Sequence, residues 1–92
     1  MTPTILVVED EPAIQELVVI NLKHAGFLVV RTSSAEEAES AIRAALPDLL
    51  ILDWMLPGQS GVALAKKLRA DERTRELPII MLTARVLSLI HI

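Results

Sequence analysis

Hydrophobic residues occur along this chain in blocks of two kinds. Short unbroken runs of Val, Ile and Leu, each bounded by polar or turn-forming residues, are typical of parallel strands covered on both faces. Four such runs occupy residues 5–8, 27–30, 49–52 and 79–82. Between these runs the hydrophobic residues recur at the spacing of a helix. The pattern predicts strands and helices in strict alternation, an order that favours an α/β fold with a parallel sheet and helices on both faces.

Three amphipathic helices are predicted between the strands. The first covers residues 12–25, and Gly26 is placed to end it. The second begins at a capping box in residues 34–37 and ends before Pro47, while the third begins near residues 60–61. The residues expected to face the sheet are Ile14, Leu17, Val18, Asn21, Leu22 and Ala25; Ala35, Ala38, Ala41, Ile42 and Ala45; and Val62, Leu64, Ala65 and Leu68.

Acidic and hydroxyl side chains follow three of the predicted strands. Glu9, Asp10 and Glu11 come directly after the first strand, Asp53 after the third and Thr83 after the fourth. If the strand order is 2-1-3-4, the chain reverses direction between the first and third strands, and a crevice opens beyond their carboxyl ends. We therefore expect these side chains to converge on one edge of the sheet.

A cluster of carboxylates needs a counter-ion. Two ionised carboxylates about 5 Å apart repel by roughly 3 kcal/mol at an effective dielectric constant near 20. Mg²⁺ suits one or two carboxylates with water, carbonyl and phosphate oxygens, whereas Ca²⁺ needs more protein oxygens than three short loops supply. Asp53 lies at a strand end before a Pro-Gly turn that can expose it, and a carboxylate can attack phosphorus as a nucleophile.

Composition narrows the classes of function. The 92 residues carry a net charge of −3, contain no cysteine and show no block of Lys or Arg, which argues against direct contact with nucleic acid and against a thiolate metal site. No hydrophobic run approaches the roughly 18 residues that cross a bilayer, and the N-terminus lacks the pattern of a secretory signal. We expect a single domain in the cytoplasm, without membrane contact.

Three segments in register resemble the receiver domains of two-component response regulators. They are ILVVEDE at residues 5–11, DLLILDWMLPGQSG at residues 48–61 and PIIMLTAR at residues 78–85. Within that family, the sequence of residues 53–58 is most similar to the phosphate-regulon branch of the winged-helix transcription regulators. The resemblance implies a flavodoxin-like, doubly wound parallel sheet of order 2-1-3-4, here with the fifth strand and last helix of the family missing.

The resemblance also implies roles for individual residues. Asp53 would accept a phosphoryl group from a sensor histidine kinase, and Thr83 would be the switch hydroxyl that responds to it. Asp10 and Asp53 would bind Mg²⁺ directly, Glu9 would assist through water, and Met55 would supply its main-chain oxygen. Such a domain phosphorylates itself in the presence of Mg²⁺ and loses the phosphoryl group slowly, so it is a switch rather than a turnover enzyme.

The end of the chain departs from the family pattern. Receivers usually run to about 120 residues, and the part absent here carries the lysine that pairs with the phosphoryl group and the surface through which family members form homodimers. We therefore expect residues 1–85 to form a truncated receiver, and residues 86–92 to be an apolar tail of non-native origin. The tail could fold back as an edge strand beside residues 79–82. The DNA-binding effector domain expected to pass on the signal lies outside this sequence.

Other interpretations of the same residues are open. Asp10 could cap the first helix, Asp53 could merely form a turn, and Thr83 could be an ordinary strand residue. The chain could be a phosphorylation-incompetent fragment that acts only as an interaction module. A metal-dependent phosphohydrolase would need a second acid at the position of Met55, and a flavin phosphate would be repelled by residues 9–11.

Overall fold

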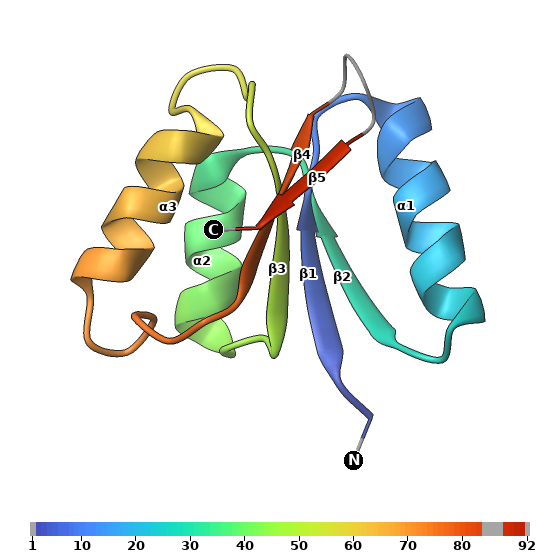
Figure 1. Ribbon diagram of the computed structural model, residues 1–92, viewed down its shortest axis with the longest axis horizontal. Helices are drawn as coiled ribbons and strands as arrows, with labels where there is room; N and C mark the ends of the chain where they lie inside the picture. The colour runs from blue at the N-terminus through green and yellow to red at the C-terminus, as the bar shows by residue number, and fades with distance from the viewer. Residues whose placement is uncertain (1, 84–87, 92) are drawn as a thin grey trace.

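A single five-stranded sheet in the order β2-β1-β3-β4-β5 forms the centre of the molecule (Figure 1). The computed structural model describes residues 2–83 and 88–91, with the side chains of residues 2–82. The strands are β1 (Thr4–Val8), β2 (Leu28–Thr32), β3 (Leu49–Asp53), β4 (Ile79–Thr83) and β5 (Ser88–His91). The first four are parallel, so the predicted order 2-1-3-4 is confirmed.

Helices cover both faces of this sheet, as the alternating pattern predicted. Helix α1 (Pro12–His24) lies against one face, and helices α2 (Ala35–Ala44) and α3 (Gly61–Ala70) lie against the other (Figure 1). The side chains of Ser34 and Ser60 cap α2 and α3 by accepting hydrogen bonds from main-chain N–H groups of the first turn.

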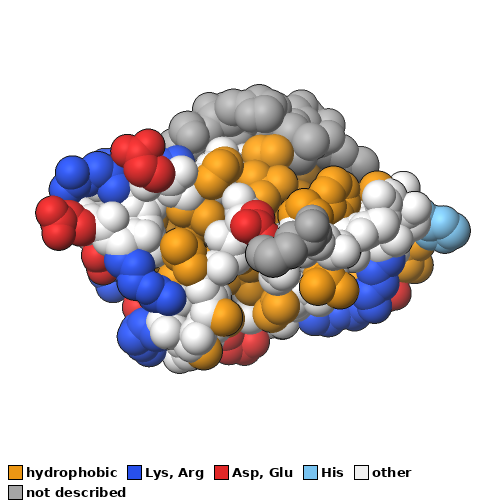
Figure 2. Space-filling view, turned by 90° about the horizontal axis from the view of Figure 1, so that it is seen from below, with side chains coloured by type: hydrophobic (Ala, Val, Ile, Leu, Met, Phe, Trp, Pro, Cys, Tyr) orange, Lys and Arg blue, Asp and Glu red, His pale blue; other side chains and the backbone are white. Residues whose placement is uncertain are grey.

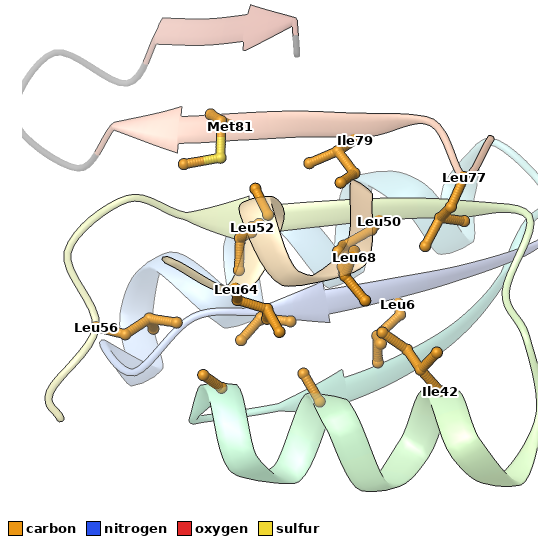
Figure 3. Close-up of a cluster of buried hydrophobic side chains, with 14 residues drawn as sticks. Leu6, Ile42, Leu50, Leu52, Leu56, Leu64, Leu68, Leu77, Ile79 and Met81 are labelled. Carbon is orange, nitrogen blue, oxygen red and sulfur yellow. The ribbon is translucent and has the colours of Figure 1, made fainter. Parts of the chain in front are cut away.

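The strands carry hydrophobic residues on both sides because each side is covered. On the α2 and α3 side, alternate strand residues such as Leu6, Leu50 and Met81 pack against Ile42 and Leu64 (Figure 3). The intervening strand residues form a second cluster with α1. Ala35 and Ala38 are fully buried, so the small residues of α2 allow close contact with the sheet, as predicted.

The orientation of α1 differs from the prediction. Val19 is its one fully buried residue among those described, and Ile14, Val18 and Leu22 pack beside it. Leu17, which was expected to face inward, is 53 % exposed, and Asn21 and Ala25 are exposed as well. The predictions for these residues were wrong. Leu17 and Asn21 border a groove that is also lined by residues of the sheet, and no second helix of the described chain fills that groove.

The second strand begins and ends later than its hydrophobic run predicted. Phe27 does not belong to it, because its N–H donates to the carbonyl oxygen of Leu22 and closes α1 together with Gly26, whose φ is +96°. At the other end the polar residues Arg31 and Thr32 continue the pairing with β1. A prediction from the hydrophobic run alone therefore misplaces the bounds of this edge strand, because the strand ends in polar residues.

A fifth strand is present, but it is not a parallel one. Residues 88–91 turn back and pair antiparallel with β4, in a register that places Ser88 opposite Thr83 and His91 opposite Ile80. This confirms the hypothesis that the tail forms an edge strand.

The end of the molecule at the amino ends of the parallel strands exposes hydrophobic side chains. Figure 2 shows them across the middle of this face, with charged side chains at its periphery, on the left and at the lower right. Leu28 at the start of β2 and Leu46 just before β3 are 57 % and 47 % exposed. Within the described residues, no helix has both the length and the apolar content that a membrane crossing requires.

Candidate metal and phosphoacceptor site

Carboxylate groups meet at the carboxyl ends of β1 and β3, the upper edge of the sheet in Figure 1. Glu9 and Asp10 directly follow β1, Asp53 is the last residue of β3, and the two strands are hydrogen-bonded neighbours. One carboxylate oxygen from each of the three residues lies within 4.8 Å of the other two. The three acidic side chains therefore lie close together, as predicted, and Asp10 and Asp53 belong to the same site.

Glu9 is the most deeply buried of the three acids, with a side chain only 1 % exposed. Its Oε2 atom accepts a hydrogen bond of 2.9 Å from the N–H of Glu11, which fixes the direction of the carboxyl group. Burial raises the pKa of Glu9 from 4.5 to about 7, and the neighbouring charge of Asp53 adds to this rise. The hydrogen bond from Glu11 opposes the rise without cancelling it.

Asp53 is also buried, at 2 % exposure. Its Oδ1 atom accepts a hydrogen bond of 3.3 Å from the N–H of Met55. Burial raises the pKa of Asp53 above its ordinary value of 3.8, and Asp10 contributes in the same direction. Without a counter-ion, Glu9 is therefore partly protonated near neutral pH.

The donor set fits a hard divalent cation. Among the described residues, Oε1 of Glu9 is the one buried side-chain oxygen or nitrogen that lacks a hydrogen-bond partner. A buried oxygen without a partner is costly, and a cation or its bound water would supply the partner. All three residues offer oxygen, the ligand that Mg²⁺ prefers, and Asp10 is exposed so that water can complete the shell.

The structural alternative for Asp10 is not supported. Glu11, not Asp10, is the N-cap residue of α1, and its carboxylate accepts a hydrogen bond of 3.4 Å from the N–H of Ala13. Asp10 therefore stands at the site without the capping role that would explain it otherwise. Trp54, the residue after Asp53, is 45 % exposed.

The structure describes two further predicted site residues only in part. Met55 follows Asp53 in the same turn, but its side chain is 65 % exposed and the role of its main-chain oxygen stays a prediction. Thr83 ends β4, one residue beyond Leu82, the β4 partner of Asp53. Its backbone is therefore at the correct edge of the sheet, whereas its side chain lies outside the described part.

Two residues that support the site were missed in the sequence. Gln15, in the first turns of α1, donates hydrogen bonds from its side-chain amide to the carbonyl oxygens of Glu9 and Thr32, at 2.9 and 3.0 Å. Gly61, the first residue of α3, lies so close to Asp53 that a β-carbon would clash with the carbonyl oxygen of Asp53. The glycine could have been noticed as a helix start without a side chain, but nothing in the hydrophobic pattern indicates Gln15.

The fold and this arrangement of acids match a known family. The family described as "Response regulator receiver domain" matches residues 5–88, which is nearly the whole chain. This chain belongs to the response regulator receiver domain family. Receiver domains are signalling switches rather than turnover enzymes.

Curated relatives of this receiver domain include phosphate regulon transcriptional regulatory proteins named PhoB. The protein from Rhizobium meliloti is 54 % identical over 85 residues, which cover 92 % of this chain and 37 % of the relative. The one from Pseudomonas aeruginosa is 46 % identical over 82 residues, or 89 % of this chain and 36 % of the relative. The predicted similarity to the phosphate-regulon branch is confirmed, and the chain spans little more than a third of these relatives.

Solved structures show the same receiver fold. The N-terminal domain of a response regulator receiver protein from Methanoculleus marisnigri has a TM-score of 0.86 and 37 % identity, covering 91 % of this chain and 68 % of that one. The response regulator TrrA from Thermotoga maritima, solved in complex with Mg²⁺-BeF, has a TM-score of 0.83 and 38 % identity, covering 91 % and 70 %. The flavodoxin-like receiver fold is thus confirmed.

Proposed function

We propose that this receiver domain is a phosphoacceptor switch in which Asp53 takes a phosphoryl group from a sensor histidine kinase with the help of Mg²⁺. The proposal extends to transcription regulation through an effector domain outside this sequence, as in the relatives named as transcriptional regulatory proteins. The observation that carries it is the meeting of Glu9, Asp10 and Asp53 around a buried oxygen that has no partner.

In the proposed phosphoryl transfer, Asp53 is the nucleophile and Met55 orients it. An oxygen of Asp53 attacks phosphorus, and an O–P bond forms while the bond from phosphorus to the donor nitrogen breaks, with the electron pair remaining on that nitrogen. The N–H of Met55 donates to Oδ1 of Asp53 and so orients the carboxylate. Hydrolysis later returns the carboxylate, which makes the phosphorylated state temporary.

The same residues suit Mg²⁺. Asp10 and Asp53 would bind it directly, Glu9 would act through water, and Met55 would offer its main-chain oxygen. When bound, the ion neutralises charge on the transferring phosphoryl group and on the acids around it. The crystal structure of TrrA in complex with Mg²⁺-BeF, at 38 % identity to this chain, supports this choice of ion.

The signal would leave the site through a change of charge. A phosphoryl group adds about −1.5 to −2 charges and strong acceptor oxygens at Asp53. The Thr83 hydroxyl, one position past the β4 partner of Asp53, would move to meet these oxygens. We propose that Thr83 is the switch residue and that homodimers form through a surface that this chain does not include. The cytoplasmic location and the separate origin of residues 86–92 also stay predictions.

Incubation with acetyl phosphate and Mg²⁺ tests the proposal directly. We expect intact-protein mass spectrometry to show one added phosphoryl group on the wild-type chain and on Asp48→Asn, but none on Asp53→Asn. Asp48 is a matched control, since it lies just before the opposite end of the same strand, where it accepts a hydrogen bond from the N–H of Thr4. Phosphorylation of Asp53→Asn at the wild-type level would overturn the proposal. An unmodified wild type that still binds Mg²⁺ would favour the interaction-module alternative instead.

A further inference from the structure

The segment that carries Glu9 and Asp10 is tied down at both ends by one residue of α1. The side-chain amide of Gln15 donates to the carbonyl oxygen of Glu9 at 2.9 Å, and the main-chain N–H of Gln15 donates to the carbonyl oxygen of Glu11 at 2.9 Å. The exposed Asp10 lies between these two anchored residues. Movement of the acidic segment away from the sheet therefore requires breaking contacts with Gln15.

The second N–H of the same amide binds the neighbouring strand. It donates to the carbonyl oxygen of Thr32 at 3.0 Å, and that oxygen also accepts the N–H of Glu9 at 3.1 Å. Thr32 is itself fixed, because its hydroxyl donates to the carbonyl oxygen of Val7 at 3.1 Å. Gln15 thus joins the carboxyl ends of β1 and β2 at the point where the regular pairing of the strands stops.

We infer that Gln15 is a positioning residue for the metal site: through two main-chain carbonyl groups, it holds the acidic segment where Glu9 and Asp10 meet Asp53. The inference rests on the proposed function and adds a residue to it. Gln15 is suited to this work because a neutral amide supplies two N–H donors without adding charge beside the acids. Its side chain is half-buried, which shields these bonds from competing water.

Two substitutions separate the donor role from an effect of charge. Gln15→Met keeps the length of the side chain and removes both donors. Gln15→Glu also removes both donors but adds a negative charge, which by itself would attract Mg²⁺ more strongly. Residues that orient metal ligands typically contribute about 10- to 100-fold to metal affinity. We expect both variants to bind Mg²⁺ about 10-fold more weakly than the wild type.

Asn21→Leu is the matched control. Asn21 lies on the same helix and its side-chain amide also donates to a main-chain carbonyl oxygen, that of Leu17, at 2.7 Å. Asn21 lines the groove between α1 and the sheet, and its side-chain hydrogen bond is to its own helix rather than to the acidic segment. We expect this variant to bind Mg²⁺ as the wild type does.

Mg²⁺ titration followed by the fluorescence of Trp54, which adjoins Asp53, measures these affinities at a temperature where thermal melts show every variant fully folded. A second readout needs no metal: in metal-free Gln15→Met, the amide hydrogen of Glu11 should exchange about 2- to 10-fold faster than in the wild type. A merely structural contribution would lower the melting temperature and leave the Mg²⁺ affinity of the folded protein unchanged.

The outcomes distinguish this inference from the proposed function. Wild-type affinity in both Gln15 variants, stronger binding in Gln15→Glu, or an equal loss in Asn21→Leu would each overturn the positioning role and leave the proposed function standing. A wild-type chain that binds no Mg²⁺ would overturn the proposed function and the positioning role together.

Discussion

At the scale of single residues, burial and mutual repulsion disfavour the ionised carboxylates of the site, and a bound proton or cation relieves this cost. Glu9 and Asp53 are buried beside each other and both have raised pKa values, with burial as the main cause. In water these acids would be ionised at neutral pH. Folding therefore favours proton uptake at this site, and that uptake links the pH of the solution to the stability of the protein.

The stability of the metal-free chain should fall as pH rises from about 5 to 8. The pKa of Glu9 is about 7 in the folded chain against 4.5 ordinarily, so the folded state keeps a proton that the unfolded state has lost. The resulting stabilisation is complete below the lower value and disappears as pH rises past the higher one. It corresponds to at most roughly 3 kcal/mol. Urea unfolding at pH 5 and pH 8 in EDTA measures it.

Glu9→Gln is the control for this pH dependence, since its amide does not titrate. The variant should lose much of the decline between pH 5 and 8, be more stable than the wild type at pH 8 without metal, and gain less stability from Mg²⁺. A decline as steep in Glu9→Gln as in the wild type would show that the dependence arises elsewhere in the chain.

The acids of the site could be predicted from the sequence, but their supports could not. Glu9, Asp10 and Asp53 follow strands whose carboxyl ends share one edge, so their meeting is a consequence of strand order. Gln15 acts on main-chain carbonyl oxygens, and no pattern of side chains along the chain reports such a bond. The Thr83 side chain and the Met55 oxygen remain predictions.

At the scale of elements, the start of α3 is fitted against the end of β3. The N–H of Gly61 donates to the carbonyl oxygen of Trp54 at 3.0 Å, and the residue is buried against Asp53. Only a residue without a β-carbon leaves room for the Asp53 carbonyl group. The start of the helix therefore lies against the main chain of Asp53, and a change in one should displace the other.

Gly61→Ala should destabilise the protein by about 1–3 kcal/mol and also weaken Mg²⁺ binding, because the added methyl group displaces the backbone of Asp53. Urea unfolding and Trp54 fluorescence measure the two effects. Gly26→Ala is the matched control: its φ of +96° makes alanine costly by about 1–2 kcal/mol, but open space surrounds it, far from the acids in the turn after α1. Loss of Mg²⁺ affinity in Gly26→Ala and not in Gly61→Ala would contradict this account.

The elements themselves were predictable where one periodicity dominated. For α2, Ala35, Ala38 and Ile42 at helical spacing identified the buried face, whereas Ala45, also predicted to face inward, lies past the end of the helix and is exposed. In α1, hydrophobic residues extend over more than one face, and the predicted inward set contained the exposed Leu17 but not the buried Val19. The buried face of α1 is determined by the sheet residues that pack against it, and the sequence of the helix alone does not identify those residues.

At the scale of the whole molecule, the sheet combines a parallel core with one antiparallel edge. Strand β5 pairs with β4 through four residues on each strand and covers main-chain groups of β4 that would otherwise face solvent. An open edge next to buried hydrophobic residues such as Met81 favours pairing with other molecules. The short returning strand therefore contributes to solubility as well as to stability.

Deletion of residues 84–92 should lower the free energy of unfolding by about 1–3 kcal/mol, because several β4 hydrogen bonds are lost. It should also increase association at high concentration, since β4 becomes the edge of the sheet. Urea unfolding and light scattering against the full chain measure both effects. An unchanged urea midpoint together with unchanged scattering would mean that β5 contributes nothing to the fold in solution.

The antiparallel direction of β5 also decides how the chain can be presented to other molecules. His91 pairs with Ile80, near the start of β4, whereas Ser88 pairs with Thr83 at the edge that bears the acids. A fluorophore or biotin attached after β5 would thus be carried away from that edge. If the chain were immobilised on a sensor surface through this attachment, the edge that bears the acids would face the solution and be accessible to a kinase in it.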